Sequence, residues 1–301
     1  MSWKHLRRRL KAPWFRRRIL REAVPVDPAA LAGATVSVAL VTYQRRRFLE
    51  LCLEALLEAI ATFPGRVEVI VWNNGSQDGT RELLDRVAAA DPRVVPLHHE
   101  RNIGVNGYKR AFDRATGAFL LELDDDVLAF PPRFLERLVT TLLRLPRLGY
   151  LSTDVVQDEF TTGSRFANEF YVPVDLDPET RVEFGATGGW CSITPRRAFE
   201  EVGGFREDPE KFFWNEDGDY QRRLRKKGWE RGVLTGVRVY HASGPWCNVD
   251  YQGIYAAKLE DIGQVETNAR AKSGLSSLPP PALPFLETFL ARHRPGRAAP
   301  G

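Results

Sequence analysis

The chain has 301 residues, of which 43% are hydrophobic and 11% aromatic, and its formal net charge is +4. This length and composition suit a large folded domain with appendages, and they exclude a disordered or fibrous protein. Residues 1–21 hold nine Lys and Arg and no acid, so the rest of the chain carries a net charge of −5. The basic isoelectric point therefore describes this N-terminal arm and does not argue for nucleic-acid binding by the remainder.

The three cysteines, Cys52, Cys191 and Cys247, lie far apart and form no Cys-x-x-Cys pair. This spacing indicates neither a disulfide framework nor a structural zinc site, and it favours a reducing compartment. No apolar run approaches the roughly 18 residues of a membrane span, and the N-terminus lacks the apolar core of a secretory signal. We therefore expect a cytoplasmic protein, at most peripheral on the inner face of the cell membrane.

Strands and helices alternate from about residue 35 onward. Short runs rich in β-branched residues predict strands, and apolar residues at helical spacing predict helices. In chain order we expect a strand, a helix and so on in alternation at 36–42, 48–60, 67–72, 81–90, 94–98, 107–115 and 118–123. This alternation predicts an α/β fold with a Rossmann-like, mostly parallel sheet and helices on both faces. Such sheets bind ligands beyond the carboxyl ends of their strands.

The second half of the chain is less regular, as expected for a region that binds an acceptor. A helix is expected to begin near Pro131. Beyond it we expect strands at 165–174, 181–185 and 237–240, and helices at 195–201 and from 216 to 227.

Three consecutive aspartates, Asp124, Asp125 and Asp126, follow the expected strand at 118–123 directly. Adjacent carboxylates repel one another, and a hard divalent cation with oxygen ligands would supply the missing positive charge. Because successive strand residues point in opposite directions, we expect Asp124 and Asp126 on one side and Asp125 on the other. The alternative is a solvated acidic turn. The strand context favours a metal site, through which a diphosphate would be held.

Two features of the second half are candidates for a binding site. Gly189 and Trp190 lie in a glycine-rich stretch, 185–191, where backbone can approach a ligand and the indole can stack on a sugar. The alternative there is a tight turn with a core tryptophan. His241 closes the strand at 237–240, and Gly244-Pro245 forms a turn after it. A lone histidine is more often structural, but this position suits a neutral imidazole that joins the aspartates on one metal.

Glu216, Asp217 and Asp219 fall in the first turn of an expected helix, where acids are also ordinary partners of the helix dipole. Asp219 precedes two arginines at i+3 and i+4, which suits a structural ion pair. Asp217 lies near Trp214 in sequence, and it fits a catalytic base better because aromatic surroundings raise the pKa of a carboxyl group.

Six motifs occur in order along the chain: SVALVTY (37–43), NNGSQDGT (73–80), DDD (124–126), RRAFEEVGGF (196–205), EDGD (216–219) and VYH (239–241). Together they resemble family 2 glycosyltransferases of the GT-A fold, over roughly residues 35–245. The resemblance implies transfer of a sugar, with inversion, from a UDP- or dTDP-sugar to an acceptor hydroxyl. It is nearer to the galactofuranosyl- and rhamnosyltransferase branch than to chain-extending synthases, which usually carry membrane spans and a Q-x-x-R-W-type motif.

The resemblance also implies roles for individual residues. Asp217 would be the general base, with Glu216 supporting the acceptor. The cation, Mn²⁺ or Mg²⁺, would be held by Asp124, Asp126 and His241. The nucleotide sugar would be bound by Thr42, Tyr43, Arg45, Asn73, Asn102, Asp124, Asp125, Gly189 and Trp190. The family usually has Asp at the position of Asn73, whose amide can still accept a hydrogen bond from the N3–H of uracil or thymine.

These features divide the chain into a basic aromatic arm, a GT-A domain and a Pro-rich tail. The arm is residues 1–34, the domain is 35–275 with a nucleotide-binding half at 35–127 and an acceptor-binding half at 128–275, and the tail is 276–301. Trp and Leu alternate with basic residues within 1–21, which suits an anionic membrane surface. A sugar or lipid-linked sugar acceptor would match this arm and a role in cell-surface polysaccharide or glycolipid synthesis. A disordered tail or a helix packed on the domain are the alternatives for the arm.

Two other functions share some of these features. A sugar nucleotidyltransferase would need a glycine-rich basic loop after the first strand, and TYQRRR (42–47) has the basic residues without the glycines. The segment 102–107 lacks the third glycine of a dinucleotide fingerprint, and no Walker A sequence occurs. A non-catalytic nucleic-acid-binding protein is suggested only by the arm. The acidic remainder argues against it, so no nucleic-acid partner is expected.

Overall fold

The computed structural model describes residues 3–156, 170–242 and 291, and for residues 3–10 it describes the backbone only. The expected Pro-rich tail at 276–301, apart from residue 291, lies outside the described residues, as do the turn at Gly244-Pro245 and the first part of the strand expected at 165–174. So do Cys247 and the end of the domain expected at residue 275.

In the described residues, helices and strands alternate from Thr35 to Asp124 and follow a less regular order before and after this part. The helices are α1 (Trp3–Glu22), α2 (Pro28–Ala32), α3 (Arg46–Ala59), α4 (Thr80–Ala90), η1 (Gly104–Asn106), α5 (Gly107–Arg114), α6 (Phe134–Arg144), α7 (Arg196–Glu201) and α8 (Glu216–Lys226). The strands are β1 (Thr35–Thr42), β2 (Arg66–Asn73), β3 (Val94–His98), β4 (Phe119–Asp124), β5 (Val127–Ala129), β6 (Leu148–Val155), β7 (Val172–Asp177), β8 (Thr180–Phe184), β9 (Cys191–Pro195) and β10 (Glu230–His241).

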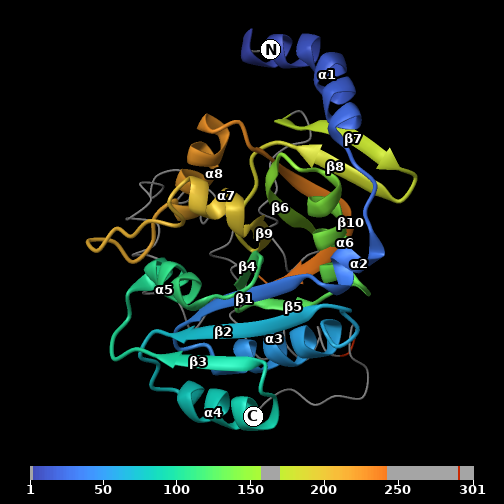
Figure 1. Ribbon diagram of the computed structural model, residues 1–301. Coiled ribbons are helices and arrows are strands. Elements are labelled where there is room, and N and C mark those ends of the chain that lie inside the picture. The colour runs from blue at the N-terminus through green and yellow to red at the C-terminus, as the bar shows by residue number, and fades with distance from the viewer. Residues whose placement is uncertain (1–2, 157–169, 243–290, 292–301) are drawn as a thin grey trace.

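The strands form one large sheet with the order β3-β2-β1-β4-β9-β6-β10-β8-β7 (Figure 1), and β5 pairs with β10 outside this order. The first four strands pair in parallel, as do β6 and β10. The order reverses between β1 and β4, because the chain first winds outward to β3 and then returns to the other side of β1. In open α/β sheets, the crevice beyond the carboxyl ends of the strands at such a reversal is where ligands bind. The predicted α/β fold class is confirmed.

The sequence did not predict the antiparallel strand β9 or its neighbour β6. β9 pairs antiparallel with both β4 and β6, in the middle of the sheet. Buried hydroxyl side chains interrupt the apolar pattern of both strands: Ser152 and Ser192 are fully buried and bond to each other and to the carbonyl of Gly188. Because satisfied hydroxyls can be buried at little cost, a polar pattern here does not mark an exposed loop.

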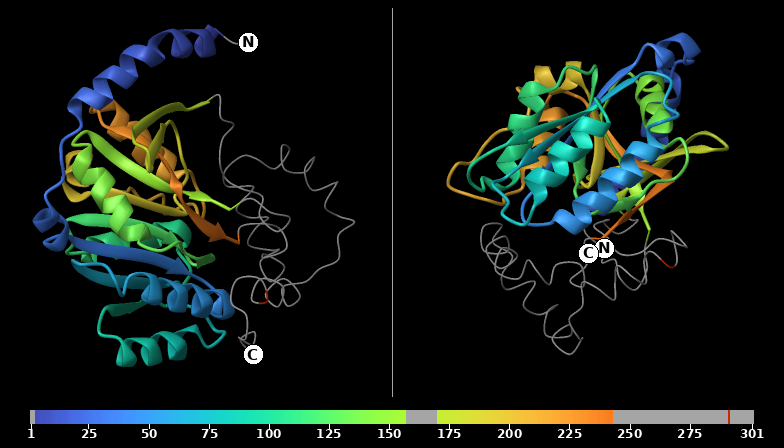
Figure 2. Two further views of the ribbon diagram at one scale, coloured as in Figure 1. Left: turned by 90° about the vertical axis from the view of Figure 1, so that its right-hand side faces the viewer. Right: turned by 90° about the horizontal axis from the view of Figure 1, so that it is seen from below.

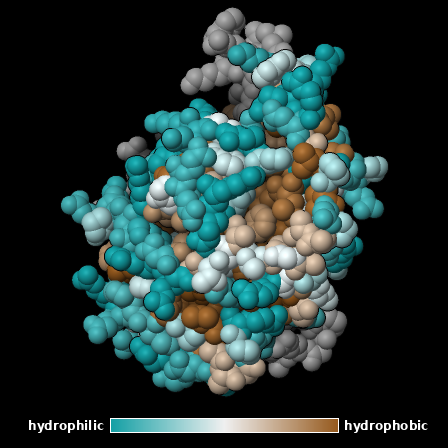
Figure 3. Space-filling view, in the orientation of Figure 1, coloured by the Kyte–Doolittle hydropathy of each residue, from teal (hydrophilic) through white to brown (hydrophobic). Residues whose placement is uncertain are grey.

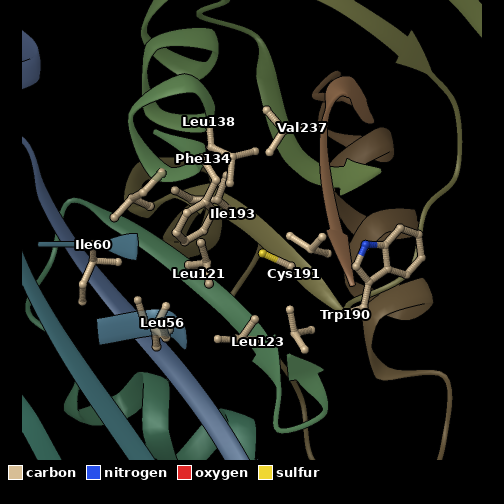
Figure 4. Close-up of a cluster of buried hydrophobic side chains, with 14 of the residues drawn as sticks. Leu56, Ile60, Leu121, Leu123, Phe134, Leu138, Trp190, Cys191, Ile193 and Val237 are labelled. Atoms are coloured by element: carbon tan, nitrogen blue, oxygen red, sulfur yellow. The ribbon is translucent and has the colours of Figure 1, made fainter. Parts of the chain in front are cut away.

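Helices cover both faces of the sheet and form two buried clusters. On one face, α3, α4 and α6 pack on the aliphatic residues of β1, β2 and β4. Figure 4 shows the part of this cluster in which α3 and α6 meet β4, β9 and β10. On the other face, α5, α7 and α8 pack around the aromatic residues Tyr108, Phe112, Tyr150, Phe205 and Tyr220. Rigid layers on both sides therefore fix the positions of the strand ends.

The basic arm is a helix whose C-terminal half packs on the far edge of the sheet. Phe15 contacts Phe184 of β8 edge to face, with ring centroids 5.2 Å apart, and Ile19 is 3% exposed. Arg16 donates from Nε to the carbonyl of Pro173 on β7 at 2.9 Å, and Arg18 pairs with Glu230 of β10. For this half of the arm, the structure shows the packed helix that was one of the alternatives.

The outward side of α1 exposes both apolar and basic side chains. Trp14 is 65% exposed and Leu20 is 48% exposed, beside the arginines of the second half of the helix. Figure 1 shows α1 projecting from the body beyond β7. In Figure 3, the surface over the part of α1 that is not grey is mainly hydrophilic. Among the helices described here, none is both long and apolar enough to cross a membrane.

Candidate active site

The candidate site is built at the carboxyl ends of the central parallel strands. In register, Thr42 at the end of β1 lies opposite Asn73 at the end of β2, and Val41 lies opposite Asp124 at the end of β4. Parallel pairing therefore brings three sequence-predicted residues to one edge of the sheet, although 82 residues separate the first from the last. Tyr43 follows directly and is partly buried.

Asp124, Asp126 and His241 gather at one point of this edge. Nε2 of His241 lies 3.1 Å from Oδ2 of Asp124 and 3.1 Å from Oδ1 of Asp126. One ligand atom from each residue lies within 4.8 Å of the others. The pairing of β10 with β5, and the hydrogen bond of 2.9 Å from the amide of Ala242 to the carbonyl of Asp126, hold the histidine there. The sequence prediction that these three residues come together is confirmed.

The negative charges of Asp124 and Asp126 favour a positive charge at this point, as the pKa of His241 shows. Burial lowers the pKa of His241, but the carboxylates of Asp126 and Asp124 outweigh burial and raise it to about 9. Burial raises the pKa of Asp126, but the charges of Arg45 and His241 outweigh it and hold that pKa well below its ordinary value. A set of two carboxylate oxygens and one imidazole nitrogen suits a divalent cation such as Mn²⁺. The residues present therefore fit the expected metal.

Asp125 is not one of the three grouped residues, and its carboxylate meets Arg45. Nη1 of Arg45 lies 2.8 Å from Oδ1 of Asp125, and its Nη2 lies 3.0 Å from Oδ2 of Asp126. All three side chains are 8% exposed or less, and the guanidinium lies over the ring of Phe48. Burial raises the pKa of Asp125 to about 6, although Arg45 opposes this shift. The structure thus uses Arg45 and Asp125 in a buried ion pair, which is a different role from the nucleotide contact that the resemblance implies.

The loops after β1 and β2 are bonded to each other at the expected nucleotide site. Gln44 adopts a positive φ of 54°, and its amide donates to Oγ of Ser76 at 3.0 Å. Oδ1 of Asn73 accepts from the amide of Ser76 at 3.0 Å, and its Nδ2 lies 3.3 Å from Nδ1 of His98. An amide oxygen has two lone pairs, so Asn73 keeps one for a further donor. Asn102 caps the next loop by accepting from the amide of Gly104 at 2.8 Å.

The glycine-rich stretch passes beside these strand ends, and its tryptophan is part of the core. Trp190 is 2% exposed, donates from Nε1 to the carbonyl of Thr153 at 3.1 Å, and stacks on His241 at 6.3 Å between ring centroids. The core alternative therefore describes Trp190, because its indole lies in the core and not on an open sugar site. A Cβ at Gly189 would lie 2.4 Å from Oε1 of Glu122, so this position has no room for a side chain.

Asp217 lies in the first turn of α8, near the glycine-rich stretch. Asn215 caps this helix by accepting from the amide of Gly218 at 3.1 Å. Gln221 bonds to both the amide and the carbonyl of Thr187, at 3.1 and 2.6 Å, and so fixes α8 to the glycine-rich stretch. A Cβ at Gly188 would lie 3.8 Å from Oδ2 of Asp217. The carboxylate of Asp217 therefore lies close to this stretch.

Asp219 plays the structural role that its spacing predicts. Its carboxylate lies 2.8 Å from Nε of Arg223 and 3.4 Å from Nη2 of Arg222. Burial raises the pKa of Asp219, but the hydrogen bond and charge of Arg223 outweigh it and lower the pKa from its ordinary value. The prediction of an i+3 and i+4 ion pair is confirmed.

The sequence interpretation missed Glu122, a buried acid beneath the site. Glu122 is 2% exposed on β4 and accepts from the hydroxyl of Tyr150 at 2.7 Å. Burial, together with the charges of Glu216 and Asp217, raises its pKa well above the ordinary value. One feature of the sequence pointed to it: it is the single charged residue within the apolar run before the three aspartates.

Comparison with curated proteins finds glycosyltransferases from several sources. The chain is 39% identical to Glycosyltransferase AglD of Haloferax volcanii over 114 residues, which are 37% of this chain and 18% of AglD. It is 28% identical to the succinoglycan biosynthesis protein ExoA of Rhizobium meliloti over 195 residues, which are 59% of this chain and 55% of ExoA. It is 35% identical to the bactoprenol glucosyl transferase of Shigella phage SfX over 78 residues, which are 25% of this chain and 26% of that protein. The matches thus span about half or less of these relatives.

Solved structures share the fold. The mannosyltransferase PcManGT from Pyrobaculum calidifontis, in complex with GDP-Man and Mn²⁺, matches with a TM-score of 0.60 and 20% identity, over 98% of this chain and 85% of PcManGT. TarS 1-349 of S. aureus matches with a TM-score of 0.53 and 16% identity, over 87% of this chain and 73% of TarS. At these identities the likeness shows a common fold, which is GT-A. The family model "Glycosyl transferase family 2" matches residues 37–235, and the chain therefore belongs to glycosyltransferase family 2.

Proposed function

We propose that this family 2 glycosyltransferase moves a sugar from a nucleotide diphosphate sugar to an acceptor hydroxyl, with inversion and with a divalent cation. The observation that carries this proposal is the meeting of Asp124, Asp126 and His241 at the carboxyl edge of the sheet, within 4.8 Å of one another. Mn²⁺ or Mg²⁺ held by these residues would neutralise the charge that grows on the leaving diphosphate.

Transfer with inversion requires one general base, which removes the proton of the acceptor hydroxyl. The acceptor hydroxyl attacks the anomeric carbon from the face opposite the diphosphate, the bond from that carbon to the phosphate oxygen breaks, and Asp217 takes the hydroxyl proton. Asp217 suits this role because α8 and the glycine-rich stretch fix its position. Glu216 stands beside it at the start of the same helix and would orient the acceptor.

The donor nucleotide would lie along the ends of β1 and β2. Thr42 and Asn73 end these strands, Tyr43 follows β1, and Asn102 lies in the loop before η1. The sugar would pass the backbone of Gly189, a position with no room for a side chain. Asn73 can accept from the N3–H of uracil or thymine, which favours a UDP- or dTDP-sugar. PcManGT was solved with GDP-Man, so a guanine nucleotide belongs in the test.

The acceptor would be a sugar or a lipid-linked sugar used in cell-surface polysaccharide or glycolipid synthesis. Two relatives support this: one is named for succinoglycan biosynthesis and another as a bactoprenol glucosyl transferase. The arm supports it as well, because α1 combines nine basic residues within 1–21 with the exposed Trp14. Such a helix would hold the enzyme peripherally on the inner, anionic face of the cell membrane.

Release of nucleotide from a panel of UDP-, dTDP- and GDP-sugars tests the proposal, with and without a chelator. We expect one nucleotide class to be cleaved with Mn²⁺ or Mg²⁺, the activity to vanish in chelator and to return with added cation. The product of transfer should carry the anomeric configuration opposite to that of the donor. Full activity in chelator would contradict the role of the cation, and retained configuration would contradict inversion.

A further inference from the structure

The segment that leads to Asp217 is held by a residue from the other half of the domain. Residues 206–215, here called the acceptor segment, connect the turn after α7 to α8 and contain no helix or strand. The side chain of Asn106, in η1, bonds to this segment in both directions. Its Nδ2 lies 3.0 Å from the carbonyl of Asp208 and 2.9 Å from that of Lys211, and its Oδ1 accepts from the amide of Asp208 at 2.9 Å and from Nε1 of Trp214 at 3.2 Å.

The backbone beside Asn106 also lies against the acceptor segment. The amide of Val105 donates to the carbonyl of Phe212 at 2.8 Å. Gly104 has a φ of +60°, and a Cβ there would lie 1.7 Å from the carbonyl oxygen of Phe212. Only glycine permits both this conformation and this close approach. The segment is therefore in direct contact with η1 along several residues.

On its other side, η1 is held by the end of β2. Asn74 is 1% exposed, and its Nδ2 donates to the carbonyl of Gly104 at 3.1 Å. Its Oδ1 accepts from the amide of Ile103 at 3.2 Å and from Nε1 of Trp72 at 2.8 Å. Asn74 directly follows Asn73, the residue expected at the nucleobase. The buried side-chain amides of Asn74 and Asn106 thus form a hydrogen-bond network. It connects the end of β2, where the nucleotide is proposed to bind, to η1 and to the acceptor segment.

A side-chain amide is the group that this arrangement requires. It offers both donors and acceptors, and Asn106, at 5% exposed, uses both kinds. Asp has nearly the same shape but no N–H, so Asn106→Asp would leave the carbonyls of Asp208 and Lys211 without their donor and bring a negative charge next to them. Buried polar series of this kind rigidify a structure only while every member is satisfied.

We propose that Asn106 is a positioning residue that fixes the acceptor segment, and hence Asp217, relative to the bound nucleotide, with Asn74 as its link to the nucleotide edge. The proposal rests on the proposed role of Asp217 as the base. Nucleotide that binds at the end of β2 should then protect the acceptor segment from hydrogen exchange.

Hydrogen exchange of the full chain, measured with and without UDP, dTDP or GDP in the presence of Mn²⁺, tests this. In the wild type we expect nucleotide to slow exchange in 206–215. In Asn106→Asp we expect faster exchange there, loss of the nucleotide effect, an unchanged nucleotide Kd, and a kcat for transfer reduced about 10- to 100-fold. Trp214→Phe removes only one of the hydrogen bonds and should give a smaller effect, which keeps the test open if Asn106→Asp does not fold.

Lys211→Ala is the matched control. Nζ of Lys211 lies 3.8 Å from Oδ2 of Asp208. The substitution keeps the backbone carbonyl to which Asn106 donates, so hydrogen exchange and kcat should stay at wild-type values. Exchange in 206–215 that is unchanged in Asn106→Asp and Trp214→Phe, or insensitive to nucleotide in the wild type, would overturn the proposal. If Asp217→Asn keeps full turnover while the exchange results hold, the base assignment is wrong and the link between the two sites stands.

Discussion

At the scale of single residues, the charge balance of the site depends on Arg45. Its guanidinium bonds to Asp125 and Asp126 with all three side chains 8% exposed or less. A buried ion pair contributes little relative to apolar residues, but removal of one partner leaves an uncompensated charge in a medium of low dielectric constant. Arg45 therefore supplies a permanent cation next to the one that Asp124, Asp126 and His241 would bind.

We predict that Arg45→Gln lowers the free energy of unfolding by about 3–5 kcal/mol, because two buried carboxylates lose their cation. Arg45→Lys should cost less, since it keeps the charge and loses only the forked geometry. Urea denaturation of the metal-free protein measures both. Arg86→Gln, which breaks a pair whose arginine side chain is 60% exposed, is the control and should change stability by less than about 1 kcal/mol. Equal losses in Arg45→Gln and Arg86→Gln would contradict this account.

At the scale of elements, the carboxylate of Glu68 connects three neighbouring parallel strands near their N-terminal ends. Glu68 on β2 accepts from the hydroxyl of Ser37 on β1 and from the amide and hydroxyl of Thr116, at 2.7 and 2.9 Å, just before β4. Burial raises the pKa of Glu68, but the hydrogen bonds from Ser37 and Thr116 outweigh it and lower the pKa from its ordinary value. This acid therefore stabilises the three strands only while it is ionised.

The lowered pKa of Glu68 determines how its contribution to stability changes with pH. Because the pKa of Glu68 is lower in the folded than in the unfolded state, its contribution is present above the unfolded pKa of about 4.3 and is lost as the pH falls through the folded pKa. Glu68→Gln should therefore be less stable than the wild type at pH 7 and at pH 5, and the difference should shrink toward pH 3.5. Urea midpoints of both proteins at the three pH values measure it. A difference that grows with acidity would refute the assignment.

Elements with a clear period were predictable and those with buried polar residues were not. The strands β1 to β4 and the helices α3 to α5 lie within two residues of their predicted bounds. Their apolar patterns are complete because both faces of a parallel sheet are covered. β9 was not predicted, since its Ser192 is buried through hydrogen bonds to Ser152 and Gly188. Likewise Asp124, Asp126 and His241 were predictable from their positions at strand ends, whereas the contacts of Arg45 and Asn106 depend on tertiary packing.

At the scale of the whole molecule, the N-terminal end of α1 and the end of β10 at the candidate site lie toward the same side. Ile19 and Phe15 fix the C-terminal half of α1 on the sheet edge, so this half of the arm is attached to the domain. In Figure 2, left, the N-terminal end of α1 lies toward the same side as the arrowhead of β10, where the strand ends at His241. A membrane met by the N-terminal end of α1 would thus lie on the side toward which β10 points.

We predict that the full chain floats with liposomes that contain anionic phosphatidylglycerol and not with neutral phosphatidylcholine liposomes. The triple variant Arg7→Gln, Arg8→Gln and Arg9→Gln should bind less, by about 1 kcal/mol for each charge removed at low salt. The variant Arg81→Gln, Arg86→Gln and Arg110→Gln loses the same charge elsewhere and is the control. Equal flotation of the two triple variants would show that the arm is not the membrane contact.

The central claim is that Asp217 takes the proton of the acceptor while the strand ends hold the donor. Asp217→Asn, assayed for transfer and for donor affinity in the same buffer with Mn²⁺, tests it most directly. We predict that kcat falls by about 100- to 10 000-fold while the Kd for the donor stays within about two-fold, because a general base acts on the attacking hydroxyl and not on the bound nucleotide. A donor affinity that falls in parallel with turnover, or a turnover that is unchanged, would contradict the account.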